Sequence, residues 1–159
     1  MGKISNVTLF ILLLCISLTS CAILQQQKEN ERISHAALKS YINTDKAREM
    51  LSTQPLKGRL ERLTKKQAKA FAVTRQVLKP VTQVMQGYIL SEGHSQDQNS
   101  RSLVIVDPER EVLMVAWVDI DTRKVRILLD APENLSPEVV PEMEEYAEEW
   151  AMGQLGMSQ

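Results

Sequence analysis

Residues that could carry catalysis are few in this chain. Its 159 residues include two histidines, His35 and His94, and two cysteines, Cys15 and Cys21. A nucleophile that relies on a neighbouring histidine as its base therefore has only two histidines to draw on. His35 falls in a segment with helical spacing, where a partly exposed histidine is the ordinary interpretation. This inventory argues against nucleophilic catalysis.

The second histidine belongs to a polar segment, SEGHSQDQNSR at residues 91–101, between two expected strands. The side chains of Glu92, His94 and Asp97 could converge there on a divalent cation. A dedicated metal site needs at least three well-placed ligands, and the segment holds no ligand pair of the H-E-x-x-H type. We interpret it as a solvated loop and expect no metal and no cofactor. A small-molecule or cation-binding module that uses this loop and the sheet face is the alternative function.

Carboxylates gather near the C-terminus, where four glutamates share the polar face of an expected helix: Glu144, Glu145, Glu148 and Glu149. Glycoside hydrolysis needs two carboxyl groups that face each other across a cleft of about 5–9 Å, which one helix face does not provide. The six glycines are scattered and form no phosphate-binding loop. We therefore do not expect an enzyme, and a hydrolase or hydrolase inhibitor is the least favoured function. The four glutamates are instead a candidate contact for a protein partner.

An apolar run, VTLFILLLCISL at residues 7–18, follows Lys3 and precedes two small residues. This layout is typical of a secretory signal, and the run is shorter than the roughly 20 apolar residues of a membrane span. The letters LTSC at 18–21 resemble the lipobox of bacterial lipoproteins: an aliphatic residue, two small residues and a cysteine. The resemblance implies that residues 1–20 are removed as a signal peptide and that the Cys21 thiol carries a diacylglyceryl lipid. An uncleaved anchor and a released periplasmic protein are the alternatives.

The same resemblance also implies where the mature chain is located in the cell. Ala22 stands where many inner-membrane lipoproteins have aspartate, which implies the outer membrane and a domain that faces the periplasm. Residues 21–31 would form a lipid-anchored polar tether before a single domain at 32–159. About ten residues of flexible coil reach roughly 15–20 Å, so the tether would hold the domain close to the membrane.

Charge is divided unevenly along the mature chain. Residues 21–79 hold 13 basic and 5 acidic side chains, whereas residues 80–159 hold 5 basic and 15 acidic ones. In the expected helix at 59–78, four basic residues lie opposite the apolar stripe at 100° per residue: Arg62, Lys65, Lys66 and Lys69. Arg59 and Lys79 flank them, and we count Arg59 with the four as one basic stripe. Such a stripe could contact anionic lipid headgroups or an acidic partner. The alternative is that it is solvated or pairs with the acidic last helix. Nucleic acid is not expected, because interleaved surface aromatics are missing and the address is the envelope.

The periodicity predicts an α+β domain. Residues 33–51 show helical spacing in two pieces, and a second helix is expected at 59–78. Strands are predicted at 87–92, 102–106, 111–120 and 124–129, the last three joined by the turns DPER and DTR. Ser136 and Pro137 then begin a C-terminal amphipathic helix. We expect an antiparallel sheet of three to four strands with N-terminal helices and the C-terminal helix packed on one sheet face.

Together these features predict a lipid-anchored cell-envelope protein that acts through contacts rather than catalysis. An interaction or assembly factor is the favoured hypothesis. Its expected partners are the membrane, through the N-terminal lipid, and another envelope protein or an anionic lipid surface, through the basic or the acidic helix.

Overall fold

A computed structural model describes residues 32–133, 135 and 139–157 of the chain. The expected signal peptide, Cys21, Ala22, the tether and the expected helix cap of Ser136 and Pro137 lie outside the described residues. From Ile33 onward the chain forms one compact unit. Its helices and strands are, in chain order, α2 (His35–Lys39), α3 (Ala47–Ser52), α4 (Leu56–Thr64), the 3₁₀ turn η1 (Lys65–Gln67), α5 (Ala68–Val73), β1 (Val77–Leu78), β2 (Thr82–Gln83), β3 (Ile89–His94), β4 (Ser100–Asp107), β5 (Val112–Asp119), β6 (Lys124–Asp130) and α6 (Val139–Gln154).

The sheet is antiparallel throughout and has six strands in the described residues, in the order β1-β3-β4-β5-β6, with β2 also paired to β3. The four longer strands match the four predicted from their β-branched and aliphatic residues. The two extra strands are two residues long and lie on the outer edge of β3, on either side of Pro80. Proline cannot donate to a strand ladder, so it interrupts what would otherwise be one longer edge strand. Strands this short show no periodicity, which is why the expected strand count was too low.

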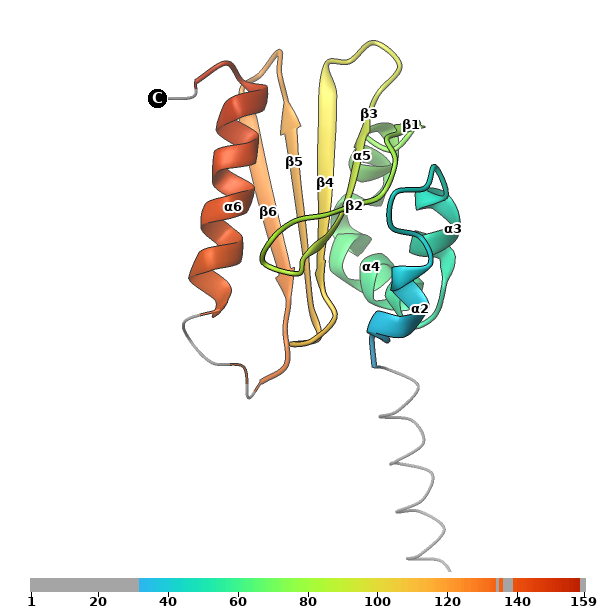
Figure 1. Cartoon of the computed structure of the whole chain (residues 1–159). Coiled ribbons are helices and arrows are strands. Elements are labelled where there is room, and N and C mark those ends of the chain that lie inside the picture. Colours follow the sequence, from blue (N-terminus) through green and yellow to red (C-terminus); the bar gives the residue numbers. More distant parts are fainter. Residues whose placement is uncertain (1–31, 134, 136–138, 158–159) are drawn as a thin grey trace, which may run out of the picture. The chain divides into compact units, whose positions relative to one another are not determined.

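Helices cover both faces of the sheet (Figure 1). On one face, α2–α5 pack on Ile89, Val104, Val106, Leu113, Val115 and Trp117. On the other face, α6 packs on Leu90, Leu103, Ile105, Val112, Met114 and Ala116. Because side chains alternate between faces along a strand, the central parts of β4 and β5 are apolar on both sides and buried, and only Ser100, Arg101 and Asp119 at their ends are partly exposed. The expectation of helices on a single sheet face was wrong, since a two-sided apolar strand requires a layer on each side.

The β4–β5 connection follows the predicted turn chemistry. Asp107 Oδ1 accepts hydrogen bonds from the backbone N–H groups of Glu109 and Arg110, at 3.0 and 3.1 Å. Asp107 Oδ2 also forms an ion pair with Arg110 at 2.8 Å. An aspartate at the first position of a type I turn forms such bonds to its own backbone, which confirms this part of the prediction.

The helix expected at 59–78 is instead three shorter pieces, and it ends at Val73. The Thr74 hydroxyl donates to the Phe71 carbonyl at 2.7 Å, and the backbone then turns so that Val77 and Leu78 pair with β3. Gly93 of β3 permits this close approach, because a Cβ there would lie 2.9 Å from the Thr74 carbonyl oxygen. Tertiary pairing with the sheet edge therefore overrides the helical pattern of residues 74–78.

Candidate functional site

Four of the five basic residues predicted for the stripe are exposed on α4, η1 and α5. They are Arg62, Lys65, Lys66 and Lys69, which we call the basic surface. Arg59 was wrongly included, because it is only 7% exposed. Its Nε forms an ion pair with Asp130 Oδ2 at 2.8 Å, and its Nη2 donates to the carbonyls of Glu111 at 2.8 Å and Asp130 at 3.1 Å. Arg59 thus ties α4 to the end of β6 and cannot reach an external anion.

The glutamates of α6 lie where the helical spacing placed them. Glu144, Glu145, Glu148 and Glu149 are exposed, and so is Glu142 in the first turn, while Met143, Ala147 and Ala151 are fully buried. Across the part of the chain that the structure describes, no ion pair involves a glutamate of α6.

The sheet lies between the basic surface and these glutamates (Figure 1). The idea that the basic stripe and the acidic helix pair with each other is therefore wrong. Periodicity assigns a face to each helix but does not say on which side of the sheet the helix packs.

The predicted loop at 91–101 is mostly strand. His94 pairs with Arg101 in the β3–β4 ladder, and the connection shortens to residues 95–99. Each candidate ligand also has another partner: Glu92 an ion pair with Lys79 at 2.7 Å, and His94 Nδ1 a contact with the Ser95 carbonyl at 2.7 Å.

The third candidate ligand, Asp97, accepts hydrogen bonds from the Ser95 hydroxyl and the Asn99 backbone N–H. These bonds hold the pKa of its carboxyl below the usual range. Among the residues that the structure describes, no group of three His, Cys, Asp or Glu side chains could hold a metal ion. Glu92, His94 and Asp97 therefore do not converge on a site.

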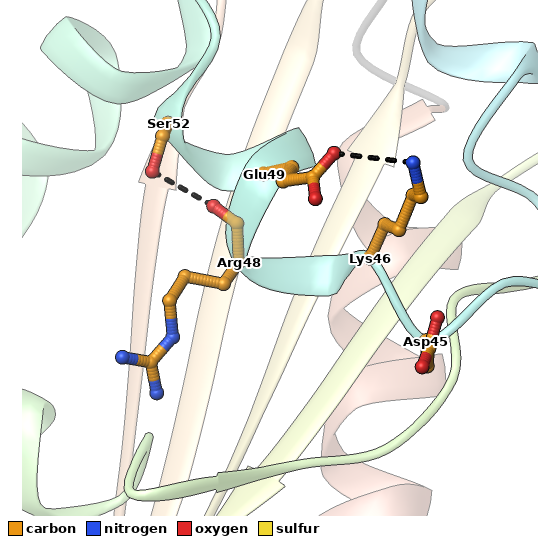
Figure 2. Close-up of a pocket in the computed structure, with 5 residues that line it drawn as sticks. All are labelled: Asp45, Lys46, Arg48, Glu49 and Ser52. Atoms are coloured by element: carbon orange, nitrogen blue, oxygen red, sulfur yellow. Dashed lines mark hydrogen bonds and ion pairs between the residues drawn. The ribbon is translucent and has the colours of Figure 1, made fainter.

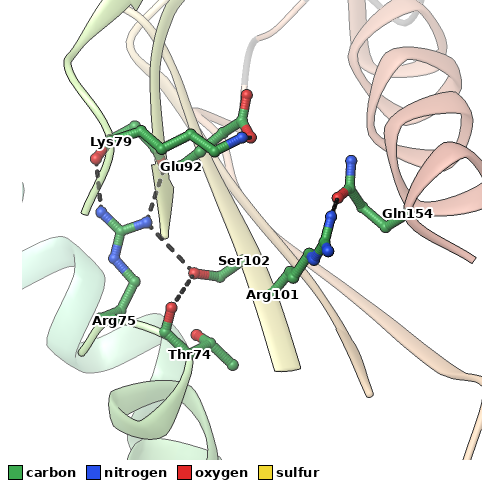
Figure 3. A network of polar contacts seen from close by, with 8 residues as sticks. Thr74, Arg75, Lys79, Glu92, Arg101, Ser102 and Gln154 are labelled. Atoms are coloured by element: carbon green, nitrogen blue, oxygen red, sulfur yellow. Dashed lines mark hydrogen bonds and ion pairs between the residues drawn. The ribbon is translucent and has the colours of Figure 1, made fainter. Parts of the chain in front are cut away.

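A polar network around Arg75 was not found from the sequence (Figure 3). The Arg75 guanidinium donates to the Ser91 carbonyl at 2.8 Å and to the Ser91 hydroxyl at 2.6 Å, and more weakly to Ser102 at 3.3 Å. Burial lowers the pKa of Arg75 to about 10, although the negative charge of Glu92 acts in the opposite direction. The network ties the turn after α5 to β3 and β4, so we assign it a structural role.

One surface hollow, of about 510 Å³, is lined by Asp45, Lys46, Arg48, Glu49 and Ser52 beside α3. Figure 2 shows that Lys46 and Glu49 face each other, at 3.5 Å, and that the Ser52 hydroxyl donates to the Arg48 carbonyl at 2.7 Å. Two acidic and two basic side chains balance here. The hollow therefore offers no uncompensated charge to a ligand.

A second hollow, of about 300 Å³, is lined by glutamates and aromatic residues: Gln86, Tyr88, Glu142, Glu145, Tyr146 and Glu149. We call it the acidic hollow. The rings of Tyr88 and Tyr146 meet edge to face, with centroids 6.4 Å apart. Burial, and then the charge of Glu142, raise the pKa of Tyr88, while burial and the charge of Glu92 raise that of Tyr146.

Both tyrosines in the acidic hollow are therefore neutral hydrogen-bonding groups at neutral pH, beside three carboxylates. Such a lining suits a cation. This hollow could not be predicted from the sequence, because Tyr88, which directly precedes β3, lies about 50 residues before α6 in the chain.

No helix among the described residues is long and apolar enough to cross a membrane. Comparison with known proteins adds no relative: no protein-family model, no curated protein and no solved structure matches the chain.

Proposed function

We propose that this chain is a lipid-anchored cell-envelope protein that acts as a non-catalytic interaction or assembly factor. In this proposal Cys21 carries the lipid, residues 21–31 form the tether, and the domain faces the periplasm from the outer membrane. The lipobox-like LTSC at residues 18–21 supports the anchor and the address.

One observation carries the interaction role. The basic surface and the α6 glutamates lie on opposite sides of the sheet, so neither neutralises the other. From 56 to 73 the chain holds six basic residues and one acidic residue, and α6 holds five glutamates and no basic residue. Each side therefore keeps its charge for an external partner. We assign the basic surface to anionic headgroups and the acidic helix to a protein.

The length of the expected tether is compatible with a basic surface that contacts the membrane. A coil of about ten residues reaches roughly 15–20 Å, so the domain can come down onto the membrane surface. Direct contact is needed, because at physiological salt exposed charges more than a Debye length of about 8 Å apart are largely screened. Each basic side chain near an anionic surface contributes about 1 kcal/mol, so four such residues can orient the domain on the membrane. The alternative module, which used the sheet face and the 91–101 loop, has no support, because helices cover both faces of the sheet and much of that loop is strand.

The anchor is tested by metabolic labelling of the full chain with palmitate, followed by membrane fractionation. We expect label in the outer-membrane fraction and none in a Cys21→Ser variant. Unlabelled protein, or a mature chain that still begins at Met1, would refute the anchored function.

The membrane contact is tested with the chain from Ala22 onward, which lacks the lipid, and vesicles that contain anionic phospholipid. Lys65→Gln/Lys69→Gln should weaken binding about thirtyfold, and 0.5 M salt should abolish it. The matched control is Arg123→Gln/Lys124→Gln, which removes the same charge from exposed residues at the β5–β6 turn. Equal losses in both variants would show that net charge, rather than the basic surface, causes the binding.

A further inference from the structure

The outer edge of β6 has no neighbouring strand. β6 is the last strand of the sheet, and among the residues that the structure describes only β5 pairs with it (Figure 1). Its seven residues pair with β5 without a bulge and include neither proline nor glycine. A regular edge strand of this kind offers backbone N–H and C=O groups with which another strand can pair.

The opposite edge of the sheet is protected. There β1 and β2 lie along β3, each is only two residues long, and Pro80 separates them. Very short edge strands and proline both prevent the addition of a further strand. The chain therefore blocks one edge of its sheet and leaves the longer edge, β6, accessible to another strand.

An apolar groove lies between this edge strand and α6. It measures about 520 Å³ and is lined by Val125, Ile127, Glu148, Ala151 and Met152. Val125 and Met152 are 37% and 38% exposed, although both side chains are apolar. Side chains alternate along a strand, so Val125 and Ile127 share the α6 face of β6 with Leu129. A strand added to this edge would remove part of this apolar surface from water.

The sequence of β6, KVRILLD, is complementary to an antiparallel copy of itself. Two-fold symmetry with Ile127 opposite its own copy pairs all seven residues. Lys124 then lies opposite Asp130 of the second copy at both ends of the strand pair. The ion pair between Asp130 and Arg59 uses Oδ2, and the side chain of Asp130 is 32% exposed, so a lysine can approach it. On the α6 face, Val125 meets Leu129 of the second copy.

Neighbouring registers fit less well. A two-fold axis at Arg126 would place this arginine opposite its own copy, and like charges directly opposite each other destabilise a sheet. An axis at Leu128 would leave Lys124 and Val125 opposite residues beyond the end of β6. Charge and strand length therefore select the register centred on Ile127.

This symmetry also keeps the two charged surfaces apart. When two sheet edges pair antiparallel, the two-fold axis is perpendicular to the sheet, so matching layers of the two copies lie on the same side. Both basic surfaces then face one way, and both α6 helices face the other way. Such a dimer can place two basic surfaces on one membrane and still leave the α6 glutamates accessible to a protein.

We propose that β6 is a homodimer interface, at which two copies of this chain pair their β6 strands antiparallel around Ile127 and form one continuous sheet. The two apolar grooves meet across the axis. The inference goes beyond the proposed function, because it concerns the domain whether or not Cys21 carries a lipid. A shared membrane would strengthen the dimer, since two anchored chains meet at a high effective concentration.

Sedimentation velocity of the full-length protein in detergent tests the dimer. We expect a monomer–dimer equilibrium in the micromolar range. Val125→Lys should raise the dissociation constant about tenfold, because a lysine on an edge strand opposes pairing and here would lie opposite Leu129. The matched control is Val73→Lys at the end of α5, where the valine is 45% exposed, and it should change the constant less than about twofold.

Cysteine cross-linking tests the register. The full chain with Cys15→Ser and Cys21→Ser has no other thiol. In this background, oxidation with copper phenanthroline should link two copies of Ile127→Cys, because the position lies opposite itself. Val125→Cys should not be linked, since it lies roughly 13 Å along the strands from its own copy, beyond the reach of a disulfide. Val125→Cys/Leu129→Cys should restore the link.

Three results would overturn the inference: a monomer throughout the micromolar range, equal effects of the two lysine variants, or disulfides that form as readily from Val125→Cys as from Ile127→Cys. If the protein is monomeric but still carries palmitate at Cys21 and forms cross-links to another protein in intact cells, the inference fails and the proposed function stands. A dimer of chains that carry no palmitate would refute the anchored function and leave the inference standing.

Discussion

Buried polar side chains on the two sides of the sheet differ in how completely they are hydrogen-bonded. On the side of α2–α5, the buried guanidinium of Arg59 reaches one carboxylate and two carbonyls, and that of Arg75 reaches Ser91 and Ser102 with only its Nε unmatched. On the side of α6, Tyr88 Oη and Trp150 Nε1 are buried and make no well-formed hydrogen bond among the described residues. The first side uses its polar groups to fix helices to strands, and the second leaves donors unmatched.

Outside the basic surface, exposed charge also differs between the two sides. Beside α3 and α4 the exposed pairs Lys46–Glu49 and Lys57–Glu61 place opposite charges together. Along α6, glutamates follow one another at three- and four-residue spacing, which costs a helix a few tenths of a kcal/mol per pair. A surface that keeps such repulsion is suited to an external cation. The comparison therefore separates a side whose buried polar groups stabilise the domain, and whose basic surface we assign to the membrane, from a side that is available to a protein partner.

The largest expected effect tests the stabilising side. Arg59→Met should lower the free energy of unfolding by about 3 kcal/mol, because Asp130 and two carbonyls lose their buried partner. Arg62→Met on the same helix, where the side chain is exposed, should change it by less than about 0.5 kcal/mol. Urea denaturation of both variants measures the difference. Similar values would show that Arg59 is not the link between α4 and β6.

Replacing Tyr88, in contrast to Arg59, should stabilise the domain. Tyr88→Phe should raise the free energy of unfolding by about 1 kcal/mol in the absence of a partner, because it removes a buried hydroxyl that makes no well-formed hydrogen bond among the described residues. Tyr41→Phe, at a partly buried tyrosine on the other side of the sheet, is the comparison and should give no such gain. A loss of stability in Tyr88→Phe would mean that the hydroxyl is satisfied and that the acidic hollow is a structural feature.

Removal of one negative charge should change the stability of the domain only slightly, and with opposite sign on the two sides of the sheet. Glu145→Gln should raise the stability by a few tenths of a kcal/mol, since it relieves repulsion along α6. Glu61→Gln should lower it by a similar amount, since Glu61 pairs with Lys57 at 3.9 Å. Thermal unfolding at low salt measures both, and 1 M salt should erase both. The same sign for both variants would contradict the difference between the two surfaces.

The smallest effect concerns high pH. The pKa values of Tyr88 and Tyr146 are raised in the folded state, so folding favours their neutral form. This contribution is fully present below the ordinary tyrosine pKa of about 10 and is lost as pH rises through the folded values. Tyr88→Phe should therefore flatten the loss of stability above about pH 10. Urea denaturation at a series of alkaline pH values measures this effect. The same loss of stability with pH in Tyr88→Phe and in the unchanged protein would exclude a buried phenol at this position.

Much of the fold could be predicted from the sequence. Four strands, the Asp107 turn and the buried face of α6 follow from local periodicity and turn chemistry, which the chain carries within a few residues. The strands β1 and β2 could not be predicted, because two residues carry no periodicity. β1 also depends on Gly93, which lets the chain approach β3.

The candidate site was less accessible to sequence reasoning. Arg59 resembles its exposed basic neighbours in type and spacing, and only its contacts with β6 show that it is buried. The acidic hollow joins the start of β3 to α6, and the separation of the two charged surfaces depends on which side of the sheet each helix packs. These are tertiary relations that no local pattern carries.

The most direct test places a benzoylphenylalanine cross-linker at two positions of the full chain in intact cells: Gln86, which lines the acidic hollow, and Lys66, on the basic surface. From Gln86 we expect a defined protein adduct that disappears in Glu145→Gln/Glu149→Gln and persists in Glu144→Gln/Glu148→Gln. From Lys66 we expect no such protein adduct. The same adduct from both positions, or one from Gln86 that ignores the charge of the hollow, would contradict the account.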